Sequence, residues 1–126
     1  MSDIKYIVKP EEGMVIGILD KANCTGARVE ACRKMPGSLW WEDHDIYDDG
    51  DYYKAIARVR DGDVFDEKVG KSIVAKKIKW KYHRNMMKKY QQNISHYKNV
   101  VKTLEELETH HHAEMWKCDE ELKKYE

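Results

Sequence analysis

The second half of this 126-residue chain lacks the residues that break helices. Residues 66–125 contain no proline and a single glycine, Gly70. The chain also has no apolar run near 18 residues and no signal peptide, so the sequence predicts neither a membrane-spanning helix nor export. Its three cysteines, Cys24, Cys32 and Cys118, form no CxxC pair. We therefore expect reduced thiols and a cytoplasmic protein.

Sequence motifs of catalysis are missing as well. The chain has no GxSxG, no phosphate-binding Walker loop and no HExxH, and its cysteines and histidines have no diagnostic spacing. The three adjacent histidines, His110 to His112, point in different directions on a helix and do not supply ligands at i and i+4. The sequence therefore predicts a protein that is not an enzyme and that needs neither a metal nor a cofactor.

An apolar seven-residue repeat fills the half that lacks breakers. One row reads Ile73, Trp80, Met87, Ile94, Val101, Glu108, Met115 and Leu122, and only Glu108 interrupts it. A second row, three residues on, is apolar or aromatic from Tyr90 through Tyr97 to Leu104 and mixed elsewhere. Two apolar rows with this period are typical of a helix that meets another helix along a seam.

The length of this repeat constrains the architecture. A single helix over residues 66–125 would be roughly 90 Å long, whereas a compact domain of this size is about 30–35 Å across. The helix must therefore break and fold back, with 91–95 and 109–112 as candidate breaks, or run along another chain. The composition, 41% hydrophobic and 37% charged, suits a core shared between subunits. We expect a homodimer or a larger assembly.

The first 65 residues predict a small head. Alternating or continuous apolar runs, turn residues and caps indicate strands at 4–8, 14–19 and 52–59, a short helix at 23–35 capped by Asn23 or Thr25, and a short strand at 38–41, followed by a loop. Gly17, inside the second strand, indicates a bulge or a close approach. The expected fold is α+β: a small antiparallel sheet with a short helix and a long C-terminal helical arm, 1–65 and 66–126 forming one folding unit.

Charge is distributed unevenly, although the net charge is zero. Residues 68–89 hold nine Lys or Arg and no acid, and residues 42–51 hold six acids and no base. Both runs can simply be solvated. Alternatively, the basic run binds an anion and the acidic run meets another subunit. A short basic run on a neutral chain weighs against a nucleic-acid binder.

One segment, residues 59–84, is dense in groups that bind ligands. It contains the start of the long helix, where Asp63 or Asp66 can act as the cap, and free N–H groups there can bind phosphate. Phe65 and Trp80 offer flat faces, and Lys71 and Arg84 offer cations. Each has a structural alternative: Phe65 as a hydrophobic staple, Trp80 in the helical seam, and the cations in solvent.

The sequence DVFDEKVGKSIVAKKIKWKYH, preceded by YYKAIARVRDGD, resembles a pattern in small phage and prophage proteins. In these proteins, a strand of the form A-x-A-x precedes D-x-F-D-x-x-x-G-K and a lysine-rich helix. The chain is similar over most of residues 10–100 to the phage Thoeris anti-defence proteins of the first type, and EEGMVIGILDKA fits their first core strand. Phe65, Asp66, Gly70 and Lys71 match the short motif.

The resemblance implies that the protein sequesters a signal in the host cytoplasm. It implies binding of a cyclic ADP-ribose isomer without cleavage, cyclic oligonucleotides as a second ligand class, and interlocked long helices in a dimer. The predicted ligand-binding residues are those four, with Trp80 as a flat face and Arg28 and Arg84 chosen for their charge. The alternative is a phage structural or protein-interaction module that uses the helical arm.

Overall fold

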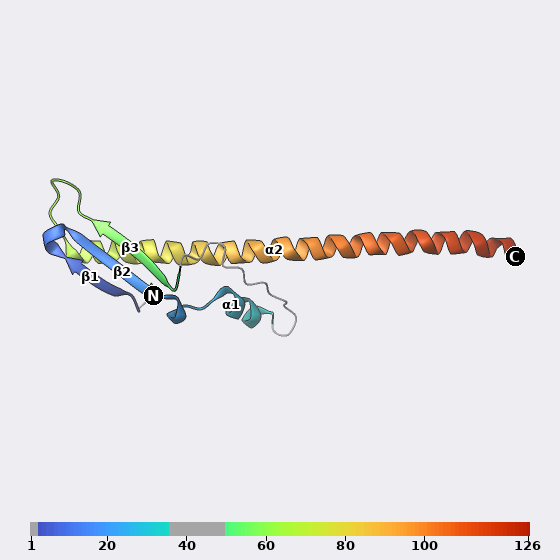
Figure 1. Ribbon diagram of the computed structural model, residues 1–126, viewed down its shortest axis with the longest axis horizontal. Coiled ribbons are helices and arrows are strands. Elements are labelled where there is room, and N and C mark those ends of the chain that lie inside the picture. The colour runs from blue at the N-terminus through green and yellow to red at the C-terminus, as the bar shows by residue number, and fades with distance from the viewer. Residues whose placement is uncertain (1–2, 36–49) are drawn as a thin grey trace. The chain divides into compact units, whose positions relative to one another are not determined.

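The computed structural model describes residues 3–35 and 50–126, which form two compact units, Met1–Tyr90 and Gln91–Glu126. The first unit contains strands β1 (Lys5–Lys9), β2 (Met14–Asp20) and β3 (Tyr52–Arg58) and helix α1 (Ala27–Lys34). Helix α2 (Glu67–Leu122) begins in this unit and supplies nearly all of the second. Short 3-10 turns at Pro10–Glu12, Lys21–Asn23 and Lys123–Tyr125 complete the element order (Figure 1).

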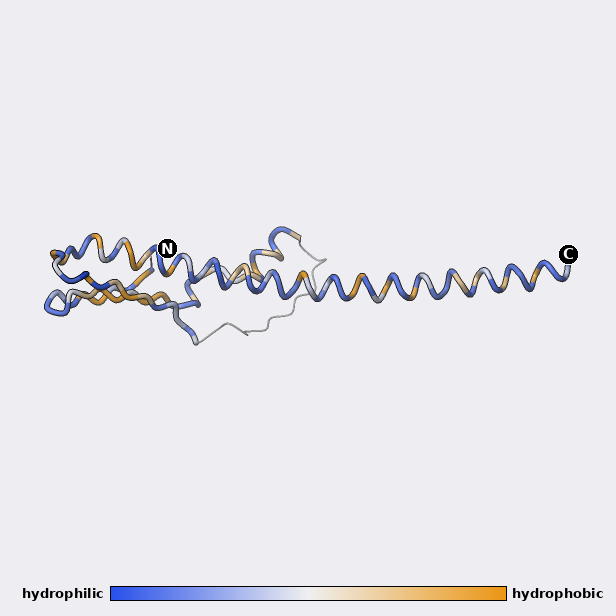
Figure 2. Tube along the Cα trace, turned by 90° about the horizontal axis from the view of Figure 1, so that it is seen from above, coloured by the Kyte–Doolittle hydropathy of each residue, from blue (hydrophilic) through white to orange (hydrophobic). Residues whose placement is uncertain are grey.

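The predicted α+β fold is confirmed. The three strands form an antiparallel sheet in the order β1-β2-β3, and the apolar run at 14–19 is its central strand, as predicted. Figures 1 and 2 show the sheet lying along the first part of α2. The expected strand at 38–41 and most of the acidic run at 42–51 lie outside the described residues.

The core of the first unit forms where one face of the sheet meets α2. Alternate residues of β2 and β3 are buried on this face, beginning with Val15, Leu19 and Tyr53, and Val74 and Ile78 of α2 are fully buried against them. These positions follow periods of two in the strands and of three to four in the helix, as expected for a sheet covered by a helix. The fold therefore brings the start of α2 against the middle of the sheet.

Gly17 marks a close approach rather than a bulge. The register of β2 against both neighbours is continuous through this residue. A Cβ atom at Gly17 would lie 2.1 Å from Cγ1 of Val74, closer than van der Waals contact allows. The missing side chain therefore lets α2 lie close to the central strand.

Two details of the helices differ from the prediction. Helix α1 begins after Gly26, and neither Asn23 nor Thr25 caps it; instead, the Asp20 carboxylate accepts a hydrogen bond from the Ala22 N–H in the preceding 3-10 turn. Helix α2 continues through both candidate breaks, 91–95 and 109–112. Polar residues of moderate helix propensity cost only tenths of a kcal/mol each, about 0.7 kcal/mol at most, whereas proline costs about 3.

Two lysines of α2 cover the outer edge of β3. Lys77 donates a hydrogen bond to the backbone carbonyl of Ile56, and Lys81 donates one to the carbonyl of Lys54. Unpaired carbonyls at a sheet edge are open to strand addition, and lysines are a common way of blocking it. These two lysines therefore have a structural role, as donors to the carbonyls of β3.

Candidate ligand-binding site

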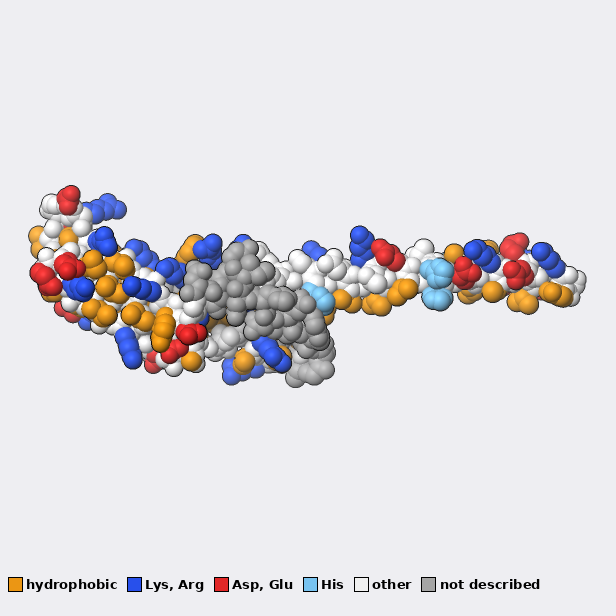
Figure 3. Space-filling view, in the orientation of Figure 1, with side chains coloured by type: hydrophobic (Ala, Val, Ile, Leu, Met, Phe, Trp, Pro, Cys, Tyr) orange, Lys and Arg blue, Asp and Glu red, His pale blue; other side chains and the backbone are white. Residues whose placement is uncertain are grey.

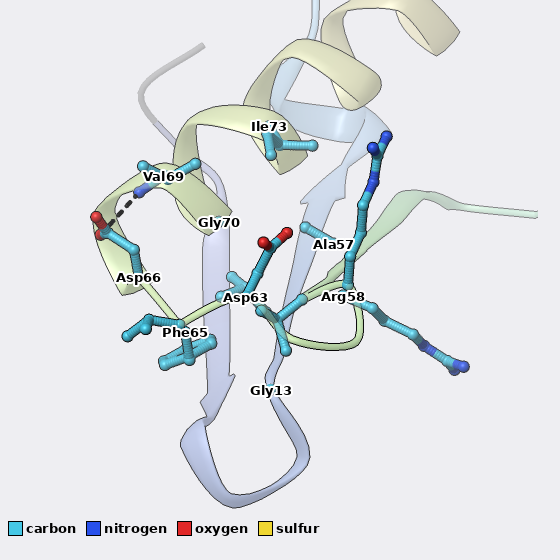
Figure 4. Close-up of a pocket in the computed structure, with 13 residues that line it drawn as sticks. Gly13, Ala57, Arg58, Asp63, Phe65, Asp66, Val69, Gly70 and Ile73 are labelled. Carbon is cyan, nitrogen blue, oxygen red and sulfur yellow. Dashed lines mark hydrogen bonds between the residues drawn. The ribbon is translucent and has the colours of Figure 1, made fainter.

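A pocket of about 560 Å³ lies where β2 and β3 meet the start of α2. Its apolar wall comes from β2, β3 and α2, and its polar groups come from the end of β3 and the turn that follows (Figure 4). This volume is in the usual range for small-molecule sites, about 300–1,000 Å³. The lining residues are Gly13, Val15, Ala57, Arg58, Val59, Arg60, Asp63, Val64, Phe65, Asp66, Val69, Gly70 and Ile73.

Phe65 is the aromatic residue of this lining. It is partly buried and packs against the core of the first unit. A hydrophobic staple would pair it with the fourth helical residue, which is Gly70 and has no side chain. The structure therefore favours a role for Phe65 as a flat wall of the pocket, packed against the core, over a role as a hydrophobic staple.

Asp66 caps helix α2 with its own carboxylate. Its Oδ1 accepts hydrogen bonds from the backbone N–H groups of Lys68, at 3.0 Å, and Val69, at 3.3 Å. Figure 4 marks the bond to Val69. Such a cap occupies donors that would otherwise be free to bind phosphate. The prediction that Asp66 can cap the helix is confirmed. The start of the helix therefore has fewer free N–H groups for binding an anion than the sequence suggested.

Gly70 borders the pocket but has a structural reason to be glycine. A Cβ atom there would lie 2.6 Å from Cγ2 of Val15 on the central strand. The glycine therefore permits the same close contact of helix and sheet as Gly17. This contact explains the residue without a ligand.

Lys71 does not line the pocket. Its ammonium group lies 3.0 Å from a carboxylate oxygen of Glu67 and 5.5 Å from the ring centroid of Tyr6 on β1. An exposed ion pair of this kind contributes little to stability, and the contact with Tyr6 directs the cation toward β1. The motif residues Phe65, Asp66 and Gly70 thus meet at the pocket, and Lys71 does not.

The remaining predicted site residues lie elsewhere on the first unit. The Arg84 guanidinium lies 5.5 Å from the Trp80 ring centroid, and this tryptophan is 61% exposed. Arg28 is exposed on α1. None of the three lines the pocket. The electrostatic choice of Arg28 and Arg84 therefore has no support from geometry, and Trp80 is open to solvent on this chain.

Sequence reasoning missed the cations that do lie at the pocket. Arg58 ends β3, and Arg60 follows it in the turn. Asp63 adds a carboxylate, and in Figure 4 its side chain is directed toward the space between β3 and the first turns of α2. The RVRDGD sequence carried the signal: two arginines flank the end of a strand whose alternation was already recognised.

Three tyrosines of the first unit have raised pKa values. Burial, and then a hydrogen bond from its hydroxyl to the Glu30 carboxylate, raise the pKa of Tyr90. Burial also raises the pKa values of Tyr53 and Tyr82. Tyr82 donates to the carbonyl of Thr25, and Tyr90 donates to Glu30, so these two phenols in their neutral form hold the α1 region on α2. Tyr53, on β3, instead accepts a hydrogen bond from Asn85 of α2.

Over residues 3–35 and 50–126, no group of three or more His, Cys, Asp or Glu side chains is arranged to hold a metal ion. Over the same residues, no helix combines the length and apolar character needed to cross a bilayer. No family model matches the chain, and comparisons with curated proteins and with solved structures find no match.

Proposed function

We propose that this protein binds a cyclic ADP-ribose-type signalling nucleotide in the pocket at Phe65 and sequesters it without cleaving it. The observation that carries the proposal is a pocket of about 560 Å³ whose lining includes one aromatic side chain, Phe65, and two exposed arginines, Arg58 and Arg60. The resemblance of the 63–71 motif to anti-defence proteins of phages supports the same ligand class. In this proposal, the protein acts in the cytoplasm of the host.

The chemistry of such a ligand fits these groups. A purine stacks on an aromatic face, and a pyrophosphate accepts paired hydrogen bonds from guanidinium groups. Arg58 and Arg60 would meet the phosphates, and Asp63 would accept hydrogen bonds from ribose hydroxyls. Because Asp66 already fills the helix N-terminus, the arginines supply the positive charge. Cyclic oligonucleotides are a second ligand class, for which the resemblance is the support.

Titration calorimetry with a panel of cyclic ADP-ribose isomers tests the binding site. A charge-assisted hydrogen bond is worth about 1.5–3 kcal/mol, so Arg58→Ala and Arg60→Ala should each weaken binding roughly ten- to hundredfold. Phe65→Leu, which keeps an apolar side chain in the core but removes the flat face, should weaken it about tenfold. Unchanged affinity in all three variants would contradict the site.

The matched controls are charged residues outside the pocket. Arg84→Ala removes the same guanidinium from an exposed position beside Trp80. Lys71→Ala tests whether membership of the motif or position at the pocket determines binding. This lysine belongs to the D-x-F-D-x-x-x-G-K pattern but lies against Tyr6. We expect both controls to bind within about twofold of the wild type, since neither cation lies at the pocket.

Sequestration also predicts that the ligand survives. The protein is incubated with excess nucleotide, denatured by heat, and the supernatant is analysed by chromatography and mass spectrometry. We expect the cyclic nucleotide to be recovered unchanged. A linear product that forms faster than in the protein-free control would identify an enzyme instead.

A protein-interaction module remains the alternative, and one observation favours it. Ile94, Val101, Leu104 and Met115 of α2 are each 51–60% exposed, an apolar row that a protein partner could cover. If no nucleotide binds at millimolar concentration while the pocket variants fold normally, protein interaction replaces nucleotide sequestration as the proposed function.

A further inference from the structure

The sheet of the first unit has an outer face, on the side away from α2, that is apolar at its centre. Along β2, the buried residues alternate with Met14, Ile16 and Ile18, which point away from the core. In Figure 2, α2 lies along one side of the sheet, and no described helix lies along the other. An antiparallel sheet with one face in solvent usually carries polar residues there, whereas a strand that is apolar on both faces is typical of a sheet covered on both. The outer face therefore calls for a covering layer.

The register of the three strands gathers apolar residues of this face into a row. Ile7 of β1 and Ile56 of β3 both pair with Ile16 of β2. Residues that pair directly across antiparallel strands point to the same side of the sheet, so three isoleucines lie next to one another across it. Ile7, on the edge strand, is 45% exposed. This isoleucine row offers an apolar contact to a partner.

Cations border the isoleucine row on both edge strands. Lys5 and Lys54 flank Ile18 from the two sides, and Lys9 and Arg58 flank the other end of β2. Figure 3 faces this side of the sheet and shows Lys and Arg side chains around an apolar patch. The outer face therefore combines an apolar centre with a positive border.

Little negative charge offsets this border. Asp20 is the acidic residue of the three strands, and its carboxylate accepts a hydrogen bond from the Ala22 N–H. A carboxylate oxygen of Glu12 lies 4.0 Å from the ammonium group of Lys9. An exposed ion pair of this kind is weak and gives way easily to another carboxylate. The face is therefore complementary to an acidic partner.

We propose that the outer face binds an acidic amphipathic helix of a partner protein. A helix lying along β2 would set its apolar stripe on the isoleucine row and one border of carboxylates over each edge strand. Lys5 and Lys9, four residues apart on β1, are about 13 Å apart along the strand. This distance corresponds to about nine residues of helix. The partner therefore carries Asp or Glu on both borders of its apolar stripe, about nine residues apart.

The shape of the face favours a helix over an anionic membrane. Lysine and arginine side chains are longer than isoleucine, so the cations stand further out than the apolar centre. A bilayer takes up an apolar face by burying it about 5–10 Å into the headgroup and acyl boundary, which requires the apolar side chains to project furthest. The side chains of a helix can instead reach between the cations to the isoleucine row.

The outer face and the nucleotide pocket share one residue, Arg58, which also lines the pocket. The variants that test the outer face therefore leave Arg58 unchanged. We expect Lys5→Glu and Lys54→Glu to bind nucleotide as the wild type does, because neither lysine lines the pocket. A failure of one proposal thus leaves the other standing.

Isoleucine methyl NMR of the full-length protein locates the binding surface. The probe is a synthetic helical peptide with a leucine stripe bordered on both sides by glutamates, and its counterpart has lysine at every glutamate. We expect the acidic peptide to shift the δ1 methyl signals of Ile7, Ile16 and Ile56. The signals of Ile73 and Ile94, exposed on α2, should not move. Shifts confined to α2, or no shifts at high micromolar peptide, would overturn the proposal.

Charge reversal tests the positive border by fluorescence anisotropy of the labelled peptide. Lys5→Glu and Lys54→Glu should each weaken binding about three- to tenfold, because each replaces an attraction by a repulsion. Ile7→Thr, which remains β-branched and suits a strand, should weaken it severalfold by removing apolar contact. The matched control is Lys76→Glu, the same change at an exposed position of α2, which should bind within about twofold of the wild type. An equal loss in Lys76→Glu, or equal binding of the lysine peptide, would show that the outer face is not the site.

Vesicles of phosphatidylserine and phosphatidylcholine test the lipid surface directly. We expect no more protein to sediment with them than with vesicles of phosphatidylcholine alone. Sedimentation that Lys5→Glu and Lys54→Glu abolish, together with no binding of the acidic peptide, would replace the helix by a membrane. Circular dichroism of each variant shows that a loss of binding is not a loss of folding.

Discussion

At the scale of single residues, the absence of a side chain does as much for the fold as any contact. Gly17 on the central strand and Gly70 on α2 face atoms of the opposite element at 2.1 and 2.6 Å from where a Cβ atom would be. Helix and sheet can therefore approach one another more closely than an alanine at either position allows. The glycines set this distance, and the buried Val15 and Val74 fill the space that it leaves.

Gly70→Ala separates this packing effect from helix propensity. Alanine in a helix interior is favoured over glycine by about 1 kcal/mol, so an open position would be stabilised. Here the new methyl group collides with Val15, and overpacking costs about 1–3 kcal/mol. We expect a net loss of up to about 2 kcal/mol in urea unfolding. Ser72→Ala, at an exposed position of the same helix, should be neutral or slightly stabilising; a stabilised Gly70→Ala would refute the close contact.

Tyr90 predicts how stability depends on alkaline pH. Its pKa is raised above the ordinary value near 10, by burial and by Glu30. As the pH rises through 10, the unfolded chain loses this proton while the folded chain keeps it, so the free energy of unfolding falls. Below pH 10 the contribution is fully present.

Tyr90→Phe should therefore flatten the alkaline limb of the stability profile. We expect a loss of about 1 kcal/mol at pH 8, from the missing hydrogen bond to Glu30, and a smaller decline than in the wild type between pH 9 and 11. Urea unfolding across this range measures both. A residual slope remains, since burial also raises the pKa values of Tyr53 and Tyr82; identical slopes in variant and wild type would exclude the mechanism.

At the scale of elements, the cap of α2 is a single carboxylate. Asp66→Ala removes the acceptor for the N–H groups of Lys68 and Val69 and should cost about 1 kcal/mol, whereas Asp66→Ser should cost only a few tenths. Asp63→Ala makes the same charge change three residues earlier and should leave stability within about 0.5 kcal/mol. Chemical unfolding of the three variants provides the comparison; equal losses for Ala and Ser at position 66 would argue against the cap.

Elements with strong periodicity could be predicted from the sequence. The three strands follow from alternation in 52–59 and from the runs at 4–8 and 14–19. The long helix follows from the absence of proline after Asp66, where Gly70 is the single glycine. What failed depended on weak local preferences: the candidate breaks in α2 and the cap of α1. Gly26 precedes α1 and has no side chain that could cap it. Because Asp20 caps the preceding 3-10 turn instead, no capping residue marks the start of α1 in the sequence.

The pocket was only partly predictable, for a different reason. Phe65, Asp66 and Gly70 are close in sequence to one another, so the motif located them. Arg58 and Arg60 lie at the same pocket because β3 ends beside the start of α2. Lys71, Lys77 and Lys81 are equally basic, but they turn to Tyr6 and to the edge of β3. Charge in a sequence does not say which surface a cation serves.

At the scale of the whole molecule, the two units should respond differently to dilution. The described residues of the first unit form a core of their own, whereas a solvated helix over 91–126 is only marginally stable without a partner. We expect the helical signal in circular dichroism to fall as the protein is diluted below the dimer dissociation constant, with the signal of the first unit retained. A helical signal independent of concentration from nanomolar to micromolar would show that this helix is stable alone.

The lysines that cover β3 leave the two edges of the sheet unequally open to the addition of another strand. Lys77 and Lys81 occupy carbonyls along one border, while no such lysine cover is found along β1 within the described residues. β1 has a lysine only at each of its ends, Lys5 and Lys9, so we expect a strand from another molecule to join at β1 more easily than at β3. Misassembly of this protein, in a crowded cell or at a high concentration in vitro, would begin on one side of the sheet, and a proline introduced into β1 would guard against it.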